Sequence, residues 1–394
     1  MPSDAAATAR SDARPLKIER IEASIFRVPL DTPVATSFGT MRDRPALLVT
    51  ATDGDGALGW GEVWCNWPVS AAEHRIRLVT EDLAELVLGG TFADARACFA
   101  FVSERIEVKA LQAGEPGPYA QAIAGLDMAI WDLSARRAGK PLHTLLAPAS
   151  TGRVPAYASG IDSRAAGRVI PDSRESGYRD FKIKVGFDLD EDIRLTNEAA
   201  RSLEAGERLA ADANQGFGLD AALRFAVGVR NAELRWLEEP LRVDAPTESW
   251  RDLSERASMQ LAGGENLIGR AAFEVAIRER HLKVIQPDAA KWGGVTGCFD
   301  VARATLDAGL TYCPHFLGSG IGLAASAHLL AAAGGEGLLE IDVNPNPLRS
   351  DIADAWPAIE EGMLRLSEKP GLGLEPEVAR IARFRTAHVE RVAD

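Results

Sequence analysis

The chain has 394 residues, of which 46% are hydrophobic and 26% charged, so it can bury the cores of one large domain and a smaller one. Its formal net charge of −13 argues against nucleic acid or an anionic membrane as a partner. No apolar run approaches the roughly 20 residues that a membrane span needs. The four cysteines (Cys65, Cys98, Cys298 and Cys313) form no CxxC pair, so we expect neither a zinc site nor disulfides, and a cytoplasmic location.

The first part of the chain predicts a small α+β domain over residues 16–145. Residues 1–15 lack the apolar core of a signal peptide and contain two Asp, which predicts a disordered leader. Strand patterns and then helical patterns follow. The strands are expected at 16–30, 45–53 and 57–63, and the helices at 71–87, 93–107 and 118–138. A polar loop that contains Gly39 is expected between the first two strands, and Trp64-Cys-Asn-Trp67-Pro68 follows the third strand.

From residue 153 the pattern changes to short apolar runs that alternate with amphipathic helical stretches. Runs covered on both faces are typical of a parallel sheet built from strand–helix–strand crossovers. The runs are 154–160, 180–185, 208–214, 234–240, 260–266, 283–288, 311–316 and 338–342. Eight such strands predict a closed barrel over residues 146–365, with its site at the carboxyl ends of the strands; a doubly wound open sheet is the alternative. Residues 366–394, with a basic and helix-like end, are expected to return to the first domain.

Three successive strands are predicted to end in an acid. Asp212, Glu238 and Glu265 are separated by 26 and 27 residues (238 − 212 and 265 − 238), which is one crossover each. Because parallel strands share one carboxyl edge, the three carboxylates can converge there. Oxygen ligands without cysteine or histidine favour Mg²⁺. The alternative is that each acid is solvated and opens the next helix. Asn214 is two residues beyond Asp212 and is a second candidate for the site.

Candidate bases lie at other strand ends. Lys182 and Lys184 are two apart, so they point to the same face of a strand. Two ammonium groups repel each other, and one should lose its proton more easily and serve as a general base. The alternative is a pair of surface lysines. Asp288 and His315 end consecutive strands, and the carboxylate would fix the tautomer of the imidazole. The other histidines are expected in packing or surface positions: His74, His143, His281, His328 and His388.

A glycine-rich segment, Gly318-Ser-Gly-Ile-Gly322, follows His315. It lacks the lysine of a phosphate-binding P-loop. Its backbone amides could instead hold a substrate carboxylate. The alternative is a flexible turn.

The chain resembles the enolase superfamily and, within it, the mandelate racemase group, over most of residues 16–370. The resemblance is carried by Lys182-Ile-Lys184, Asp212-Ala-Asn214, Glu238-Glu-Pro240, Gly264-Glu265-Asn266, Gln286-Pro-Asp288 with Lys291-Trp-Gly-Gly-Val-Thr296, the His315 segment and Leu339-Glu340. It implies a modified (β/α)7β barrel capped by an α+β domain, in an α/β fold class. It also implies the chemistry of that superfamily, in which a Lys or His base works with Mg²⁺ that stabilises an enediolate.

The resemblance further implies roles for individual residues. Asp212, Glu238 and Glu265 would bind one Mg²⁺ per active site. Lys184, with its pKa lowered by Lys182, and His315, oriented by Asp288, would act on opposite faces of the substrate. Glu340 would donate a hydrogen bond to the substrate carboxylate. Two cap loops, at about 31–42 and 62–68, would close the site and choose the substrate. The candidate contacts are Phe38, Trp64, Trp67 and, beyond the cap, Trp292.

Several functions are compatible with these residues. Dehydration of an aldonate or aldarate to a 2-keto-3-deoxy acid is favoured, while the aromatic cap residues would suit racemisation of a 2-hydroxy acid. Cycloisomerisation is a weaker third choice, because relatives of that kind lack an equivalent of His315 and use a lysine on the sixth strand instead. Lys291 lies three residues past Asp288, which does not identify it as that lysine. A metal-independent Schiff-base aldolase using Lys184 is an alternative of another class. A catalytically inactive binding module is disfavoured because every expected ligand and base is present. The partner is a small carboxylate, and a homo-oligomer is expected.

Overall fold

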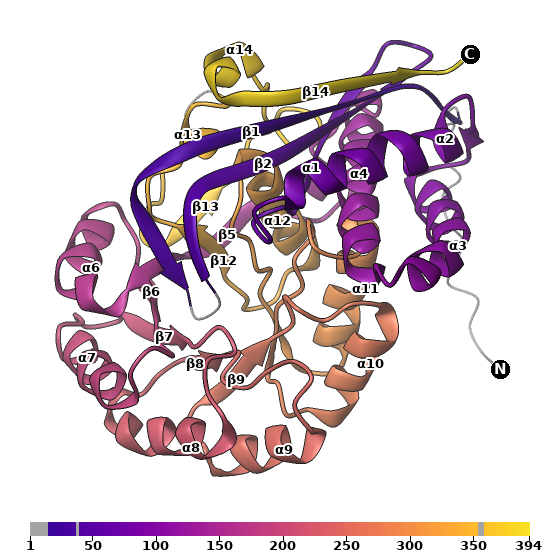
Figure 1. Ribbon diagram of the computed structural model, residues 1–394. Helices are drawn as coiled ribbons and strands as arrows, with labels where there is room; N and C mark the ends of the chain where they lie inside the picture. Colours follow the sequence, from indigo (N-terminus) through magenta and orange to yellow (C-terminus); the bar gives the residue numbers. More distant parts are fainter. Residues whose placement is uncertain (1–14, 37–38, 354–357) are drawn as a thin grey trace.

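The computed structural model describes residues 15–36, 39–353 and 358–394 (Figure 1). The expected leader, apart from Pro15, and the candidate contact Phe38 lie outside these residues. Within the described ranges, no helix combines the length and the apolar content that crossing a membrane would need.

The N-terminal part of the chain forms an antiparallel sheet with helices on one face. The sheet order is β14-β1-β2-β3, with the short β4 paired to β1. The strands are β1 (Leu16–Thr36), β2 (Gly39–Asp53), β3 (Leu58–Val63), β4 (Thr91–Phe92) and β14 (Arg385–Val392). The helical segments are α1 (Ala71–Arg77), a π-helical turn (Leu78–Leu83), α2 (Ala84–Val87), α3 (Ala95–Ala113), α4 (Pro116–Arg137) and α5 (Leu142–Leu146). The π-helical turn interrupts the single helix expected over 71–87.

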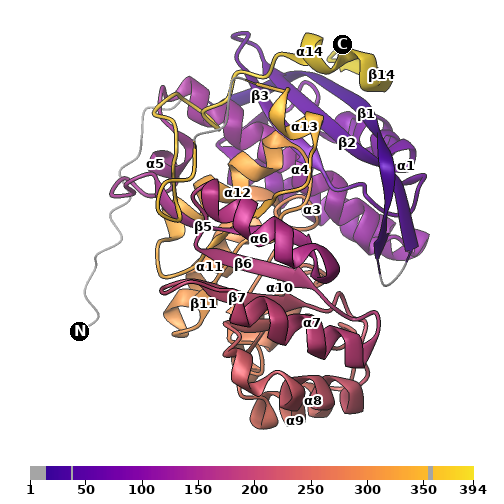
Figure 2. The same ribbon diagram turned by 90° about the vertical axis from the view of Figure 1, so that its left-hand side faces the viewer.

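The prediction of a loop at 31–42 is wrong for the described residues, because β1 and β2 continue through this stretch. β1 and β2 remain paired out to Thr36 and Gly39, with a register shift between Pro29 and Val34. Pro29 and Pro33 have no backbone N–H, which accounts for the interruption of the ladder at this point. The result is a long hairpin that reaches from the cap toward the barrel (Figures 1 and 2).

The tail was expected to end in a helix, and this is also wrong. Only α14 (Val378–Ile381) and a short 3-10 turn are helical, and β14 then pairs antiparallel with β1 along the outer edge of the cap sheet. Ala387 and Val389 are two residues apart, so both face the apolar core of the cap.

The second part of the chain forms a parallel barrel of eight strands. Consecutive strands from β5 to β11 are neighbours, and β12 returns to pair with β5, for example Leu339 with Ala156. Among the described residues no backbone ladder joins β11 to β12. The strands are β5 (Arg153–Asp162), β6 (Asp180–Lys184), β7 (Arg208–Asp212), β8 (Trp236–Glu238), β9 (Gln260–Gly263), β10 (Val284–Ile285), β11 (Thr311–Tyr312) and β12 (Leu339–Asp342).

One α-helix follows each of the first seven strands, which is the (β/α)7β arrangement, and Figure 1 shows these helices around the outside of the sheet. They are α6 (Ala166–Glu175), α7 (Leu189–Arg201), α8 (Leu219–Gly228), α9 (Thr247–Arg256), α10 (Arg270–Glu279), α11 (Gly294–Asp307) and α12 (Gly320–Ala333). After β12 come α13 (Pro347–Ser350) and β13 (Met363–Arg365), which pairs antiparallel with β5. An apolar cluster that includes Phe26, Met128 and Ile321 joins cap to barrel.

Several strands end earlier than the apolar pattern predicts. Glu265, Asp288 and His315 lie two, three and three residues beyond the last ladder residues 263, 285 and 312. Gly264 leaves the strand with a φ of 138°. Pro287 and Pro314 have no N–H to continue a ladder. These polar residues therefore occupy the loops at the carboxyl edge of the barrel rather than the strands themselves.

Candidate active site

The strand ends bring the predicted bases and acids into register. Lys184, Asp212 and Glu238 are paired residues on the adjacent strands β6, β7 and β8. Lys182 and Lys184 both face the barrel interior, as their spacing predicts. Lys182 is fully buried, and the side chain of Lys184 is 18% exposed.

Lys182 is enclosed by carboxylates. Its Nζ atom donates to Glu238 and lies 2.7 Å from Glu340 Oε1 and 3.6 Å from Asp212 Oδ2. Burial alone would lower the pKa of Lys182, but Glu238 and Glu340 outweigh it and raise that pKa well above its usual value. Lys182 is therefore a fixed positive charge beneath the site.

Lys184 is held by two side chains from the next strand. Its Nζ atom donates to Asp212 Oδ2 at 2.6 Å and to Asn214 Oδ1 at 2.9 Å. Burial lowers the pKa of Lys184 and Lys182 lowers it further, but the carboxylates of Asp212, Glu340 and Glu238 together outweigh both, so the pKa is raised. The expectation that Lys182 leaves Lys184 with a lowered pKa is wrong for this arrangement, because the nearest charge is a carboxylate. Asn214 is placed as a hydrogen-bond acceptor for Lys184.

His315 lies beside Asp288, with Nδ1 2.8 Å from Asp288 Oδ2. The other oxygen of Asp288 accepts from the backbone N–H of Ala290 at 2.7 Å, which fixes the carboxylate. On its other side, His315 Nε2 contacts Glu265. Burial lowers the pKa of His315, but Glu265 and Glu340 outweigh it and raise that pKa well above its usual value.

Glu340 differs from the hydrogen-bond donor that the resemblance implies. Its Oε1 accepts from Ser159 at 2.5 Å and faces Lys182, and its Oε2 accepts from the backbone N–H of Phe316 at 3.1 Å. Burial would raise the pKa of Glu340, but Lys182 and His315 outweigh it and lower that pKa. In this structure Glu340 is an ionised acceptor.

A cavity of about 230 Å³ lies where the cap meets the carboxyl edge of the barrel. Five of the predicted site residues line it: Trp64, Trp67, Lys184, Asn214 and His315. Its remaining lining residues are Leu30, Met41, Arg44, Asn66, Gly160, Phe187, Glu239, Glu265, Asn266, Lys291, Leu317, Asp342 and Asn344. Both cap segments, the β1–β2 hairpin and the stretch after β3, therefore contribute to it.

Trp292 was wrongly placed among the substrate contacts. Its ring packs against Phe273 of α10 with centroids 5.0 Å apart, and it lines a small groove between α10 and α11 on the outside of the barrel. Its neighbour Lys291 lines the active-site cavity instead. In an irregular loop the sequence does not indicate which way successive side chains point. Here the side chain of Lys291 points into the cavity and that of Trp292 points to the outside of the barrel.

Lys291 and Glu239 were missed as site residues. The Nζ atom of Lys291 donates to Asn266 Oδ1 at 2.8 Å, lies 3.3 Å from Glu265 Oε1 and sits 4.7 Å from the centre of the Trp64 ring. Glu239 accepts twice from Asn266 Nδ2, at 3.0 and 2.8 Å, and burial together with Glu265 raises its pKa well above the usual value. Both residues belong to the motifs that carried the resemblance, which could have indicated them.

Two backbone amides of the Gly318–Gly322 segment are occupied by a carboxylate of the cap. Glu62, buried at the end of β3, accepts from Ser319 N at 2.7 Å, Ser319 Oγ at 2.6 Å and Gly322 N at 2.9 Å. A Cβ atom at Gly318 would lie 2.6 Å from Glu62 Oε1, so glycine is required for this approach. Burial raises the pKa of Glu62 to about 7, although the hydrogen bonds from Ser319 and Gly322 lower it. The segment is a clamp between cap and barrel, neither a substrate loop nor a flexible turn.

We expect Glu62→Ala to destabilise the protein by roughly 2–4 kcal/mol, because it leaves three buried donors without an acceptor. Urea denaturation followed by circular dichroism measures this change. Glu81→Ala, at an exposed glutamate in the same domain, is the matched control and should stay within about 0.5 kcal/mol of the wild type. A Glu62→Ala midpoint as close to the wild type as the control's would contradict the clamp.

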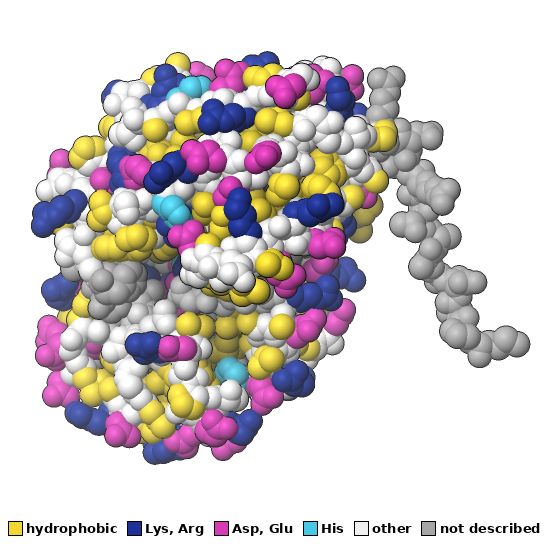
Figure 3. All heavy atoms as spheres, turned by 45° about the vertical axis from the view of Figure 1, so that its right-hand side comes forward, with side chains coloured by type: hydrophobic (Ala, Val, Ile, Leu, Met, Phe, Trp, Pro, Cys, Tyr) yellow, Lys and Arg dark blue, Asp and Glu magenta, His cyan; other side chains and the backbone are white. Residues whose placement is uncertain are grey.

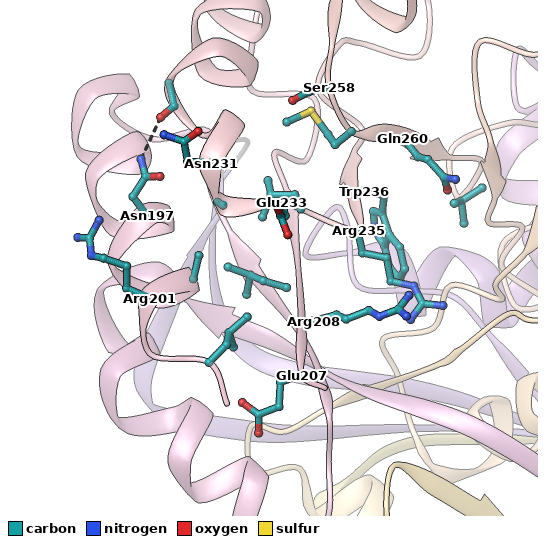
Figure 4. Close-up of a pocket in the computed structure, with 18 of the residues that line it drawn as sticks. Asn197, Arg201, Glu207, Arg208, Asn231, Glu233, Arg235, Trp236, Ser258 and Gln260 are labelled. Atoms are coloured by element: carbon teal, nitrogen blue, oxygen red, sulfur yellow. Dashed lines mark hydrogen bonds between the residues drawn. The ribbon is translucent and has the colours of Figure 1, made fainter. Parts of the chain in front are cut away.

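A larger hollow of about 1180 Å³ lies at the other end of the barrel, around the first residues of β7 to β11 (Figure 4). Its lining mixes Arg201, Arg208 and Arg235 with Glu207 and Glu233. None of the predicted bases or metal ligands reaches it, so size alone does not locate the site. On the face drawn in Figure 3, acidic and basic side chains are interspersed rather than gathered into a basic patch of the kind that binds nucleic acid.

Two family models match consecutive parts of the chain. Residues 20–147 match the mandelate racemase/muconate lactonizing enzyme N-terminal domain, and residues 167–380 match the enolase C-terminal domain-like family. The chain belongs to the mandelate racemase/muconate lactonizing enzyme family of the enolase superfamily. The predicted fold of a capped, modified barrel is confirmed.

Solved structures of this family share the whole architecture. A mandelate racemase/muconate lactonizing enzyme from Bordetella bronchiseptica RB50 is 49% identical with a TM-score of 0.87, covering 94% of this chain and 99% of that one. A racemase from Streptomyces coelicolor A3(2) with bound magnesium is 28% identical with a TM-score of 0.83, covering 94% of this chain and 100% of that one.

Curated relatives in the family are enzymes that act on acids or their lactones. L-talarate/galactarate dehydratase of Salmonella typhimurium is 29% identical over 374 residues, covering 91% of this chain and 88% of that one. Other relatives are named as cycloisomerases, as arabinonate or D-galactonate dehydratases, and as an L-Lys-D/L-Arg epimerase.

The family's magnesium chemistry can be tested against the three predicted ligands. In the described part of the chain, no group of three His, Cys, Asp or Glu side chains is arranged to hold a metal as it stands. Asp212, Glu238 and Glu265 pair with lysines and His315 instead. The donor set nevertheless fits the ion: three carboxylates lie at the ends of successive strands, and Glu265 Oε2 is buried against His315 without a well-formed hydrogen bond to any described residue.

Proposed function

We propose that the enzyme dehydrates a sugar acid, an aldonate or aldarate, to a 2-keto-3-deoxy acid. The observation that carries this proposal is that Lys184 and His315 line the same cavity from non-adjacent strands. β5 and β12 lie between them on one side of the barrel, and β7 to β10 on the other. Two proton-transfer groups can thus approach one substrate from different sides, as removal of a proton from one carbon and delivery to a leaving hydroxyl require.

Asp212, Glu238 and Glu265 would hold one Mg²⁺ per site, whose charge stabilises the substrate carboxylate as its α-proton leaves. With Asp212 and Glu265 engaged by the cation, the carboxylates that raise the pKa of Lys184 and of His315 would act on them less, so that one of the two could be neutral. That group, Lys184 Nζ or His315 Nε2, takes the proton from the carbon next to the carboxylate, and the configuration at that carbon decides which. The other group then delivers a proton to the β-hydroxyl. The carbon–oxygen bond breaks, water leaves, and the resulting enol tautomerises to the 2-keto acid.

The surrounding residues hold the two proton-transfer groups in place. Asn214 and Asp212 orient Lys184, and Asp288 orients His315. Lys182 stays protonated and offsets the charge of Glu238 and Glu340. Trp64 and Trp67 cover the cavity from the cap and limit the access of water to it.

Racemisation of a 2-hydroxy acid is the second candidate, because the cap wall is partly apolar: Leu30, Met41, Trp64 and Trp67 contribute to it. Here the second group returns the proton to the same carbon from the other face. The expected homo-oligomer and cytoplasmic location stay predictions.

A screen of sugar acids and 2-hydroxy acids with Mg²⁺ tests the proposal. Formation of a 2-keto acid, detected with semicarbazide, supports dehydration, and loss of optical rotation without keto acid supports racemisation. Activity that survives EDTA, together with borohydride trapping of substrate on Lys184, would instead establish the Schiff-base aldolase alternative.

A further inference from the structure

Arg44 brings a guanidinium group from β2 of the cap into the cavity that holds Lys184 and His315. Its side chain is 14% exposed, and its Nη1 atom lies 2.9 Å from Asp342 Oδ2 at the end of β12. Its Nε atom is buried and has no hydrogen-bond partner among the residues that the structure describes. Since guanidinium has five N–H donors, this arrangement leaves donor capacity unused in a largely dehydrated wall.

The cluster of Arg44, Asp342 and Arg349, of which the first two line the cavity, carries a net positive charge. Arg349 Nη1 lies 3.8 Å from the same oxygen of Asp342, so two guanidinium groups share one carboxylate. The other oxygen of Asp342 accepts from Asn344 Nδ2 at 2.7 Å. Of the remaining acids of the cavity, Glu239 pairs with Asn266, and Glu265 pairs with Lys291 and His315.

We infer that Arg44 recognises a second anionic group at the end of the substrate remote from the reacting carboxylate, so that the preferred substrates are diacid sugars rather than monoacid sugars. This inference rests on the proposed function and refines its substrate class. A planar guanidinium suits a carboxylate through two parallel hydrogen bonds. A buried site built to pair a charged group also discriminates strongly against an analogue that lacks it.

The competing explanation is that Arg44 only ties the cap to the barrel through Asp342. The two explanations differ in what they predict for substrates. If Arg44 only links the cap to the barrel, replacing it should affect every substrate alike. If Arg44 recognises the second carboxylate, replacing it should affect the diacid alone.

The test compares kcat/KM for galactarate and galactonate, which share a carbon skeleton but end in a carboxylate and a hydroxymethyl group respectively. The wild type should prefer the diacid by at least about tenfold. Arg44→Met should lower kcat/KM for the diacid by about 100-fold and shift the diacid-to-monoacid ratio by at least about tenfold. Arg44→Lys keeps the positive charge but loses the two parallel N–H donors of the guanidinium group, so it should retain part of the preference for the diacid. Equal losses on both substrates would overturn the inference.

Asp342→Asn provides the matched control, because it removes the ion pair and keeps Arg44. If Arg44 selects the diacid, this variant keeps the preference, and if Arg44 is only a tie, Asp342→Asn reproduces the losses of Arg44→Met. Turnover of the monoacid without preference for the diacid overturns this inference and leaves the proposed function intact. Failure of the wild type to turn over any sugar acid or to exchange its α-proton overturns both.

Discussion

Replacing Lys184 by alanine should lower kcat for a sugar acid by at least about 10³-fold, because it removes one of the two groups that can move a proton in the cavity. Mg²⁺ binding should persist. Lys184 donates to Asp212, and its loss removes a positive charge from a predicted metal ligand rather than a ligand itself. Steady-state kinetics and calorimetric titration with Mg²⁺ measure the two properties. Lys140→Ala, at an exposed turn lysine, is the matched control and should retain both.

His315→Asn should have a comparable effect on kcat while leaving the arrangement at Lys184 intact. Asparagine keeps a polar side chain beside Asp288 but cannot transfer a proton. His388→Asn, on the edge strand β14, is its control. Loss of Mg²⁺ binding in either the Lys184 or the His315 variant would show that the side chain has a different role from the one proposed.

Glu265→Gln should abolish turnover by weakening Mg²⁺ binding. One oxygen of its carboxylate is buried without a well-formed hydrogen bond to any described residue, and the carboxylate is held by His315 and Lys291 on the wall of the cavity. The loss of affinity should exceed the about 10- to 100-fold that losing a hydrogen-bond partner of a metal ligand costs. Calorimetric titration with Mg²⁺ measures it, and EDTA should abolish wild-type activity until Mg²⁺ is restored.

Glu239→Gln is the informative control for that prediction. Glu239 lines the same cavity and is also a buried glutamate, but it pairs with Asn266 and follows the predicted ligand Glu238 by one residue. It should keep Mg²⁺ binding. If Glu239→Gln lost the ion and Glu265→Gln kept it, the ligand set would be assigned to the wrong acid.

The residues that regular strands deliver were predictable, because a parallel barrel gathers one edge of every strand. Lys184, Asp212 and Glu238 needed only the spacing of crossovers, and their pairing on β6, β7 and β8 follows it. The interval also brought Glu265 to the same edge, although Gly264 had already left the strand. The apolar pattern of the strands, together with the side-by-side packing of consecutive parallel strands, was sufficient to predict where these residues lie.

Residues in loops and contacts across domains were beyond that reasoning. Trp292 and Lys291 are adjacent, yet one packs outside the barrel and the other lines the cavity, because loop geometry after Pro287 sets their directions. Glu62 and Ser319 are separated by 257 positions, so nothing local links the carboxylate to the amides that it occupies. Arg44 pairs with Val28 in the β1–β2 ladder of the cap, and nothing local in the sequence indicates that it lines a cavity shared with the barrel.

The pKa of Lys184 was also misjudged from sequence. The Lys182–Lys184 repulsion was visible in the spacing, but the opposing carboxylate of Asp212 comes from another strand and is the stronger influence. Direct pairing at 2.6 Å outweighs the charge of a lysine two residues away. Two lysines close together in the sequence therefore predict only one of the influences on the pKa of Lys184, and not the net direction of its shift.

Hydrogen exchange tests most directly whether Lys184 and His315 move the proton next to a substrate carboxylate. The enzyme is incubated with a sugar acid and Mg²⁺ in deuterated water, and the substrate and product are followed by proton NMR. We expect the α-proton signal of the substrate to disappear and deuterium to appear at C3 of the 2-keto product, next to the keto carbon. EDTA should abolish both changes, and so should the double variant that carries Lys184→Ala and His315→Asn. Retention of the α-proton in every sugar acid tested, or exchange that persists in that double variant, would contradict this mechanism.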